Sequence, residues 1–192
     1  MSLFQLPFKL ILGSKSPRRQ QLLQDLGFEF STKTQEVNEN YPSTLKRVEI
    51  AEYLAAKKAN AFLPVLKDKE VVLTSDTVVW CSNESLEKAK NEEEARQMLQ
   101  KISGRSHEVI TAFCLSSNKK SITISDICVV HFSALSSEEI EYYVKTFQPY
   151  DKAGAYGIQE WIGMWAIEKI EGSYFTVMGL PTHLLAKALQ KF

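Results

Sequence analysis

One stretch near the start of the chain decides the fold: Leu10-Ile11-Leu12-Gly13-Ser14-Lys15-Ser16-Pro17-Arg18-Arg19. An apolar strand is predicted over residues 8–13, followed by a short turn and a helix over residues 17–26. Ser16 suits the N-cap position of that helix. Pro17 suits its first turn, where the missing N–H costs no hydrogen bond. A strand that leads through a tight turn into a helix is the repeating unit of α/β folds.

The first turn of this helix carries two cations. Arg18 and Arg19 lie beside free backbone N–H groups and the positive end of the helix dipole, where a carboxylate is favoured and a cation is unfavourable by about 0.3–1 kcal/mol. Together with the hydroxyls of Ser14 and Ser16 they form a group that suits a phosphate. The alternative interpretation is a solvated basic helix start, which fits the dipole poorly.

The rest of the chain alternates helices with strands and hairpins, which predicts a mixed twisted sheet with flanking helices. We expect one domain over residues 1–192. The predicted strands cover residues 28–34, 71–80, 107–116 and 121–132, with a further hairpin of 165–170 and 173–178 about Glu171-Gly172. The other predicted helices cover residues 41–62, 92–102 and 137–147, and a last one opens at Pro181. Residues 148–159 are too rich in glycine and polar residues for a regular element.

Composition restricts the partners and the compartment. The 192 residues carry a formal net charge of zero, which argues against nucleic acid or an anionic membrane as a partner. The three cysteines lack Cys-x-x-Cys spacing and lie among apolar residues, as expected of reduced, buried thiols. The sequence shows no signal peptide and no stretch long enough to span a membrane, so we expect a cytoplasmic protein.

Two charged residues stand where apolar ones are expected. Asp76 interrupts the β-branched run of residues 71–79, so it is either paired, metal-bound or protonated, or it lies exposed at a bend. Lys58 falls on the apolar face of its helix, where it either extends along its stem to water or carries its ammonium towards anions. Glu39, in a polar loop, is a weak candidate metal ligand by itself. Lys88 follows a hairpin, and a solvated lysine is its ordinary interpretation.

Several other chemistries lack their motifs. The sequence has no Gly-x-x-x-x-Gly-Lys-Ser/Thr phosphate loop, no Gly-x-Gly-x-x-Gly after a strand and no Gly-x-Ser-x-Gly elbow. The three histidines share no metal-ligand spacing, so core or surface roles are expected for them.

The chain resembles the Maf (septum-formation-related) family of nucleoside triphosphate pyrophosphatases along nearly its whole length. The resemblance rests on blocks that follow the family's order: residues 12–19, Lys58-Ala59, Ser75-Asp76-Thr77-Val78-Val79, Leu86-Glu87-Lys88, residues 102–107, residues 151–159, residues 170–174 and Gly179-Leu180-Pro181. It implies an α/β fold with two lobes around a deep cleft, related to the inosine triphosphate pyrophosphatases (Maf/Ham1). It also implies hydrolysis of a nucleoside triphosphate to the monophosphate and pyrophosphate, with Mg²⁺ or Mn²⁺ as cofactor.

The resemblance further assigns roles to residues. It points to the branch that acts on dTTP and UTP, makes Asp76 the catalytic acid/base, and associates Arg18, Thr77 and Gln159 with substrate choice. The chain departs from the family at Gly13, which replaces a common alanine and would loosen the turn. It departs also at Asn38, where an acidic residue is frequent, and at Glu160 and Trp161, which replace small residues.

These lines join in one hypothesis. The triphosphate is neutralised by Arg18, Arg19, Lys58 and Lys88. A metal held by Glu39 and Asp76 bridges phosphate oxygens and activates the water that Asp76 positions or deprotonates. A homodimer is compatible with the resemblance. The rival hypothesis is a non-catalytic nucleotide sensor that regulates cell division, which the same basic cradle would serve.

Overall fold

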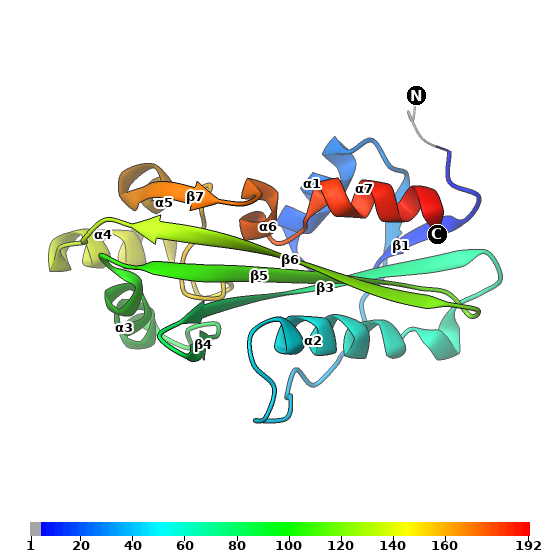
Figure 1. Cartoon of the computed structure of the whole chain (residues 1–192), viewed down its shortest axis with the longest axis horizontal. Helices are drawn as coiled ribbons and strands as arrows, with labels where there is room; N and C mark the ends of the chain where they lie inside the picture. The colour runs from blue at the N-terminus through cyan, green and yellow to red at the C-terminus, as the bar shows by residue number, and fades with distance from the viewer. Residues whose placement is uncertain (1–4) are drawn as a thin grey trace. The chain divides into compact units, whose positions relative to one another are not determined.

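A mixed β-sheet is the central element of this computed structural model, which describes residues 5–192 (Figure 1). Its strands follow the order β2-β1-β3-β5-β6-β7, with β4 paired to β3. The strands are β1 (Lys9–Leu12), β2 (Phe30–Thr32), β3 (Glu70–Cys81), β4 (Glu84–Leu86), β5 (Ser106–Ser116), β6 (Ser121–Phe132) and β7 (Ile167–Glu171). Because β1 pairs parallel with β2 and β3, while β4 and β7 pair antiparallel, the predicted mixed α/β class is confirmed.

Seven α-helices occur within residues 5–192. They are α1 (Pro17–Asp25), α2 (Val48–Asn60), α3 (Glu92–Ile102), α4 (Ser137–Phe147), α5 (Trp161–Ala166), α6 (Tyr174–Met178) and α7 (Thr182–Lys191), with a 3₁₀ turn at Leu63–Val65. The predicted caps form: the hydroxyl of Ser16 accepts from the N–H of Arg19, and Ser136 with Glu139 forms a reciprocal capping box.

The chain divides into two compact units. The first comprises Met1–Asp76, Thr111–Asp126 and Gly179–Phe192, and the second comprises Thr77–Ile110 and Ile127–Met178. The long strands β3, β5 and β6 each contribute residues to both units.

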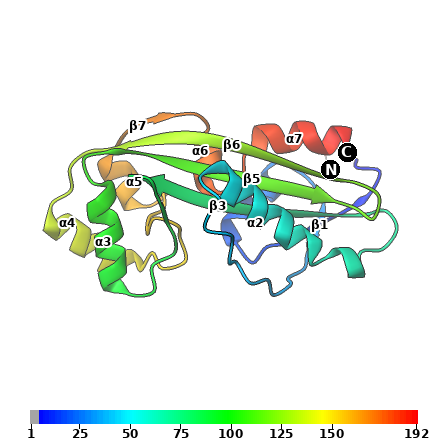
Figure 2. The ribbon, with the colours of Figure 1, turned by 60° about the horizontal axis from the view of Figure 1, so that its bottom comes forward.

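In the first unit, helices cover both faces of the strands, with α2 on one face and α7 on the other (Figures 1 and 2). The run from Leu10 to Leu12 is almost fully buried, as is the run from Val71 to Leu73 beside it. A strand that is buried on both faces has a continuous run of apolar residues in its sequence, and this pattern identified both strands.

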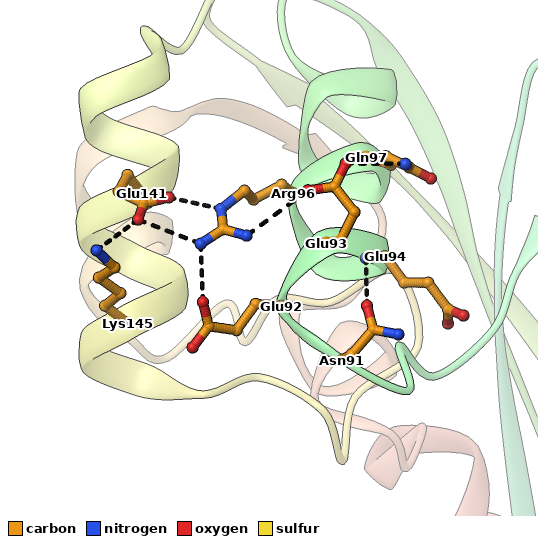
Figure 3. Close-up of polar contacts among 8 residues, drawn as sticks. All are labelled: Asn91, Glu92, Glu93, Glu94, Arg96, Gln97, Glu141 and Lys145. Carbon is orange, nitrogen blue, oxygen red and sulfur yellow. Dashed lines mark hydrogen bonds and ion pairs between the residues drawn. The ribbon is translucent and has the colours of Figure 1, made fainter.

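In the second unit, α3 and α4 lie side by side (Figures 1 and 3). Both helices direct an apolar face into one core, to which α3 contributes Leu99 and Ile102 and α4 contributes Ile140 and Tyr143. The irregular segment after α4 contributes Tyr156 and Ile158 to the same core.

The start of α2 differs from the prediction. The turn at residues 42–45 forms, but the helix begins only at Val48. Arg47 before it has φ 52°, which breaks the helical path, and the carboxylate of Glu49 accepts the N–H of Lys46. This local side-chain bond supplies the helix start in place of the one predicted at residues 41–44.

The predicted hairpin about Glu171-Gly172 is wrong. Trp161–Ala166 is a short helix, only Ile167–Glu171 is a strand, and Tyr174–Met178 is again helical. The strand pairs with β6, and a Cβ at Gly172 would lie 2.9 Å from the carbonyl oxygen of Ile127. The apolar spacing of residues 165–178 looked like two strands because short helices of one or two turns leave little periodicity to recognise.

Candidate functional site

The ammonium of Lys58 lies between two carboxylates of the first unit. Its Nζ forms an ion pair with Asp76 and lies 2.9 Å from Oε1 of Glu39. The side chains of Lys58 and Asp76 are 16% and 12% exposed, whereas that of Glu39 is 50% exposed. Asp76 is therefore a buried, paired carboxylate and not an exposed bend residue. Lys58 directs its ammonium to anions and not along its stem to water. The first alternative therefore holds for Asp76, and the second holds for Lys58.

One hydrogen bond sets the register between the helix and strand that carry this pair. The hydroxyl of Thr74 donates to the backbone carbonyl of Ala55, 2.7 Å away. Lys58 lies about one helical turn beyond Ala55, and Asp76 lies two residues beyond Thr74 on the same side of the strand. The contact between Thr74 and Ala55 therefore brings the ammonium and the carboxylate together.

Arg19 links α1 to the residue before Asp76. Its Nε donates to the carbonyl of Gly179 at 2.9 Å, and its Nη1 donates to the carbonyl of Ser75 at 2.8 Å. The hydroxyl of Ser75 donates to the same Gly179 carbonyl. Burial lowers the pKa of the Arg19 guanidinium, and the negative charge of Asp76 opposes that shift. Two of its five N–H groups are thus committed to holding the end of this strand segment.

The turn before α1 is ordered by its serines. The N–H of Ser16 donates to the hydroxyl of Ser14 at 3.2 Å, and the hydroxyl of Ser16 accepts from the N–H of Arg19. The first turn of the helix has no acidic residue, and Arg18 there is partly exposed. The two arginines thus differ: Arg19 holds backbone carbonyls, while Arg18 stands at the end of the helix that favours anions.

The structure explains the glycine at position 13 by a close contact, and not by the predicted loosening of the turn. A Cβ at this position would lie 2.9 Å from ring atom Cε2 of Phe62 and 2.9 Å from the methyl of Thr74. Glycine therefore admits the Phe62 ring behind the turn.

Asn38 also has a structural role, because its side-chain oxygen accepts the N–H of Asn40 at 2.8 Å. It acts as a turn residue in the loop that carries Glu39.

Three of the predicted site residues belong to the second unit. Thr77 follows Asp76 directly on β3 and is partly exposed. Lys88 is exposed and pairs through its backbone with Ala153, which lies in the same irregular segment as Gln159. Gln159 is exposed, just before α5. The structure thus brings Lys88 to the segment that contains Gln159.

Sequence reasoning missed the contributions of Thr74, Ser75 and Gly179. Gly179 lies in a block that supports the family resemblance, but its role is that of a backbone carbonyl. A carbonyl exists at every position, so no residue type could have indicated this role in advance.

Within residues 5–192, no three side chains of the types His, Cys, Asp or Glu lie together in a group that could hold a metal ion. Glu39 and Asp76 nevertheless both direct oxygens at one positive atom, Nζ of Lys58. Two carboxylates are enough for Mg²⁺, which takes its remaining ligands from water and phosphate oxygens. The pair fits a hard cation bound together with a phosphate compound.

Comparison with known proteins identifies the family. The model of the Maf-like protein family matches residues 9–192. The chain belongs to the Maf-like family. A relative from Flavobacterium johnsoniae, named dTTP/UTP pyrophosphatase, is 51% identical over 91% of this chain and 90% of its own. A second of the same name, from Phocaeicola vulgatus, is 46% identical over 96% of both chains. The resemblance inferred from the sequence is confirmed.

Among solved structures, the Ham1 protein of Staphylococcus aureus superimposes on this Maf-like chain with a TM-score of 0.46 and 13% identity, covering 65% of this chain and 71% of its own. None of the helices within residues 5–192 is both long and apolar enough to cross a bilayer.

Proposed function

We propose that this Maf-like protein hydrolyses dTTP and UTP to the monophosphate and pyrophosphate. The observation that carries the proposal is the Lys58–Asp76–Glu39 cluster, a buried carboxylate held by a lysine in the same unit as the α1 helix start. The names of the relatives, at 46% and 51% identity over most of each chain, support the same reaction.

The phosphate groups of the substrate bind at the start of α1. Its backbone N–H groups, the hydroxyls of Ser14 and Ser16, and Arg18 favour an anion there. Arg19 holds this helix against the Ser75 and Gly179 carbonyls and adds a positive charge beside it. Lys88 is the further cation that the sequence pattern assigns to the triphosphate.

Asp76 accepts a proton from the attacking water. A general base must be held in place, and the ion pair with Lys58 fixes the direction of the Asp76 carboxylate. Attack at the α-phosphorus breaks its bond to the bridging oxygen and releases pyrophosphate. Phosphoryl chemistry of this kind depends mainly on placement of charge, which this cluster supplies.

A divalent cation completes the site in this proposal. Glu39 and Asp76 would hold it, and Mg²⁺ or Mn²⁺ bound there supplies charge neutralisation of the phosphate oxygens and a more acidic bound water. Dialysis against a chelator is expected to abolish turnover, and added Mg²⁺ or Mn²⁺ to restore it. Full turnover after exhaustive chelation would contradict the metal assignment.

Base choice is assigned to Thr77 and Gln159. Both carry hydrogen-bonding groups, and Gln159 can donate and accept at the edge of a pyrimidine. We also propose a cytoplasmic location, supported by three buried cysteines that form no disulfide with one another. Light scattering of the purified chain measures its mass in solution and thereby tests whether it forms the expected homodimer.

The deciding experiment is a panel of canonical and modified nucleoside triphosphates with Mg²⁺ or Mn²⁺, in which pyrophosphate and orthophosphate are measured separately. Pyrophosphate release from dTTP and UTP is expected. Orthophosphate alone would mean that a different bond is cut. Tight binding of nucleotides without any product would instead favour the non-catalytic sensor.

A further inference from the structure

An ion pair joins the two ends of the segment that contains Gln159. Nζ of Lys152 lies 3.0 Å from Oε1 of Glu160, and 2.7 Å from the carboxylate of Asp151. Lys152 is 8% exposed, and Glu160 is largely covered as well. A lysine this deeply buried needs a partner, and Glu160 supplies one from the far end of the segment.

Glu160 is in turn held by α4. Its Oε2 accepts a hydrogen bond from the hydroxyl of Tyr143, which also accepts the N–H of Gly157 at 3.0 Å. A Cβ at Gly157 would lie 2.8 Å from the carboxyl carbon of Glu160, so glycine is needed for this carboxylate to fold back over the segment. Tyr143 itself is completely buried. Burial, and then the hydrogen bond to Glu160, raise the pKa of its hydroxyl, which therefore remains a donor at neutral pH.

The backbone between these contacts is held in an uncommon conformation. Ala155 has φ 56°, a left-handed conformation that non-glycine residues rarely adopt and that persists only where surrounding contacts require it. The N–H of Gly154 donates to the carbonyls of Leu86 and Glu87, next to Lys88. Residues 152–160 are therefore held by contacts with α4 and with Leu86 and Glu87, and Gln159 is the exposed residue among them.

We propose that the Tyr143–Glu160–Lys152 network is a positioning device that fixes Gln159 for selection of the pyrimidine base. The inference rests on the proposed function, in which Gln159 reads the base. An exposed glutamine on a loose segment can accommodate several bases by changing its rotamer. One on a fixed backbone presents its amide in a single direction and can reject the wrong edge. Glu160, a departure from the small residue expected there, thus gains a role.

The test measures kcat and KM for dTTP, UTP and CTP in Tyr143→Phe and Glu160→Gln. Both changes keep the shape of the side chain. We expect KM for dTTP and UTP to rise about ten-fold, kcat to stay within about two-fold, and the preference for dTTP over CTP to fall about ten-fold, the size of effect that one hydrogen bond to a charged group controls. Lys152→Arg keeps the ion pair and should keep the preference, whereas Lys152→Met should lose it.

Tyr142→Phe is the matched control. Tyr142 is the neighbouring residue on α4, is half exposed, and packs its ring on Trp161 outside the network. It should leave both KM and the preference unchanged. Because Tyr143→Phe can also destabilise the core, thermal unfolding is recorded for every variant.

The outcomes separate the two proposals. A lower melting temperature with an unchanged preference for dTTP over CTP would mean that the network is structural only, and would overturn this inference while leaving the proposed function intact. A wild-type protein that cleaves dTTP and CTP equally would also overturn it. If the wild-type protein cleaves none of the three nucleotides, the proposed function and this inference are both wrong.

Discussion

Lys58 and Arg96 are each surrounded by carboxylates, in different units of the molecule. Lys58 contacts Asp76 and Glu39. Arg96, on α3, contacts Glu92 and Glu93 of its own helix and Glu141 of α4 (Figure 3). Its Nε lies 2.5 Å from Oε2 of Glu141, and its Nη2 lies 2.8 Å from Oε2 of Glu92.

The difference lies in where the carboxylates come from. Those around Arg96 stand at helical spacing or on the facing helix, are between 38% and 69% exposed, and would be well solvated without the arginine. Asp76 instead comes from the interior of an apolar strand and is 12% exposed. An ionised group at such a place is costly to bury and is typical of a site where its charge is used. Burial of the carboxylate, and not the number of ion pairs, thus distinguishes the candidate site from a surface network.

Asp76→Asn is expected to have the largest effect. Without a base the rate of pyrophosphate release should fall about 10³-fold or more, while nucleotide binding remains measurable by calorimetry. The matched change in the other region, Glu141→Gln, should leave turnover within about two-fold. Full activity in Asp76→Asn would remove Asp76 from the mechanism, and a comparable loss in Glu141→Gln would erase the contrast between the two regions.

Lys58→Met should affect both activity and stability. Removal of the ammonium leaves the buried Asp76 carboxylate without its partner, which should lower the free energy of unfolding by about 2 kcal/mol. Turnover should also fall strongly, because the base loses its orientation. Urea unfolding and pyrophosphate release measure the two effects. The double variant with Asp76→Asn should recover part of the stability but none of the activity, and a failure to recover would mean that the lysine acts elsewhere.

The elements of this fold could be read from the sequence wherever periodicity or a cap was strong. The helix over residues 92–102 and the strand over residues 121–132 match the structure at both ends, since an amphipathic face and a long β-branched run are unambiguous. The failures were short elements and the start of α2, which begins at Val48. Residues 165–178 contain one- and two-turn helices whose apolar residues mimic strand alternation.

The site was partly predictable for a similar reason. Asp76 and Lys58 stood out because a charge in an apolar pattern requires a partner, and the structure pairs them with each other. The carbonyls of Ser75 and Gly179 that hold Arg19 could not be anticipated, because backbone groups leave no trace in residue type. The role of Glu160 could not be anticipated either, since it depends on a tyrosine seventeen positions earlier.

Gly13→Ala is expected to have a smaller effect behind the site. The added Cβ would meet the Phe62 ring and the Thr74 methyl at 2.9 Å, so one of them must shift, at a cost of about 1 kcal/mol in unfolding free energy. Chemical denaturation measures it. Combining it with Phe62→Leu, which makes room, should remove most of this cost. Additive losses in the double variant would show that the turn itself, and not the ring, requires glycine.

The smallest effect on stability is expected for Glu141→Gln, which removes the ion pair with Arg96. The dependence of this effect on pH shows that it comes from the charge of the carboxylate. Hydrogen bonds from Arg96, and then from Lys145, lower the pKa of the Glu141 carboxyl from 4.5 to about 2. A lowered carboxyl pKa means that the native state is favoured while this group is ionised in both states. The stabilisation is therefore complete above pH 4.5 and is lost as the pH falls towards 2. The difference in unfolding free energy between the wild type and Glu141→Gln should be small at pH 7 and shrink steadily below pH 4.5.

Because the charges around Arg96 are exposed, 1 M NaCl should also reduce the difference in unfolding free energy between the wild type and Glu141→Gln. The loss of stability in Lys58→Met should persist in the same salt. If the stability loss in Lys58→Met were sensitive to salt, Lys58 would belong to a surface ion-pair network as Arg96 does. The physical basis for treating Asp76 as the base would then be removed.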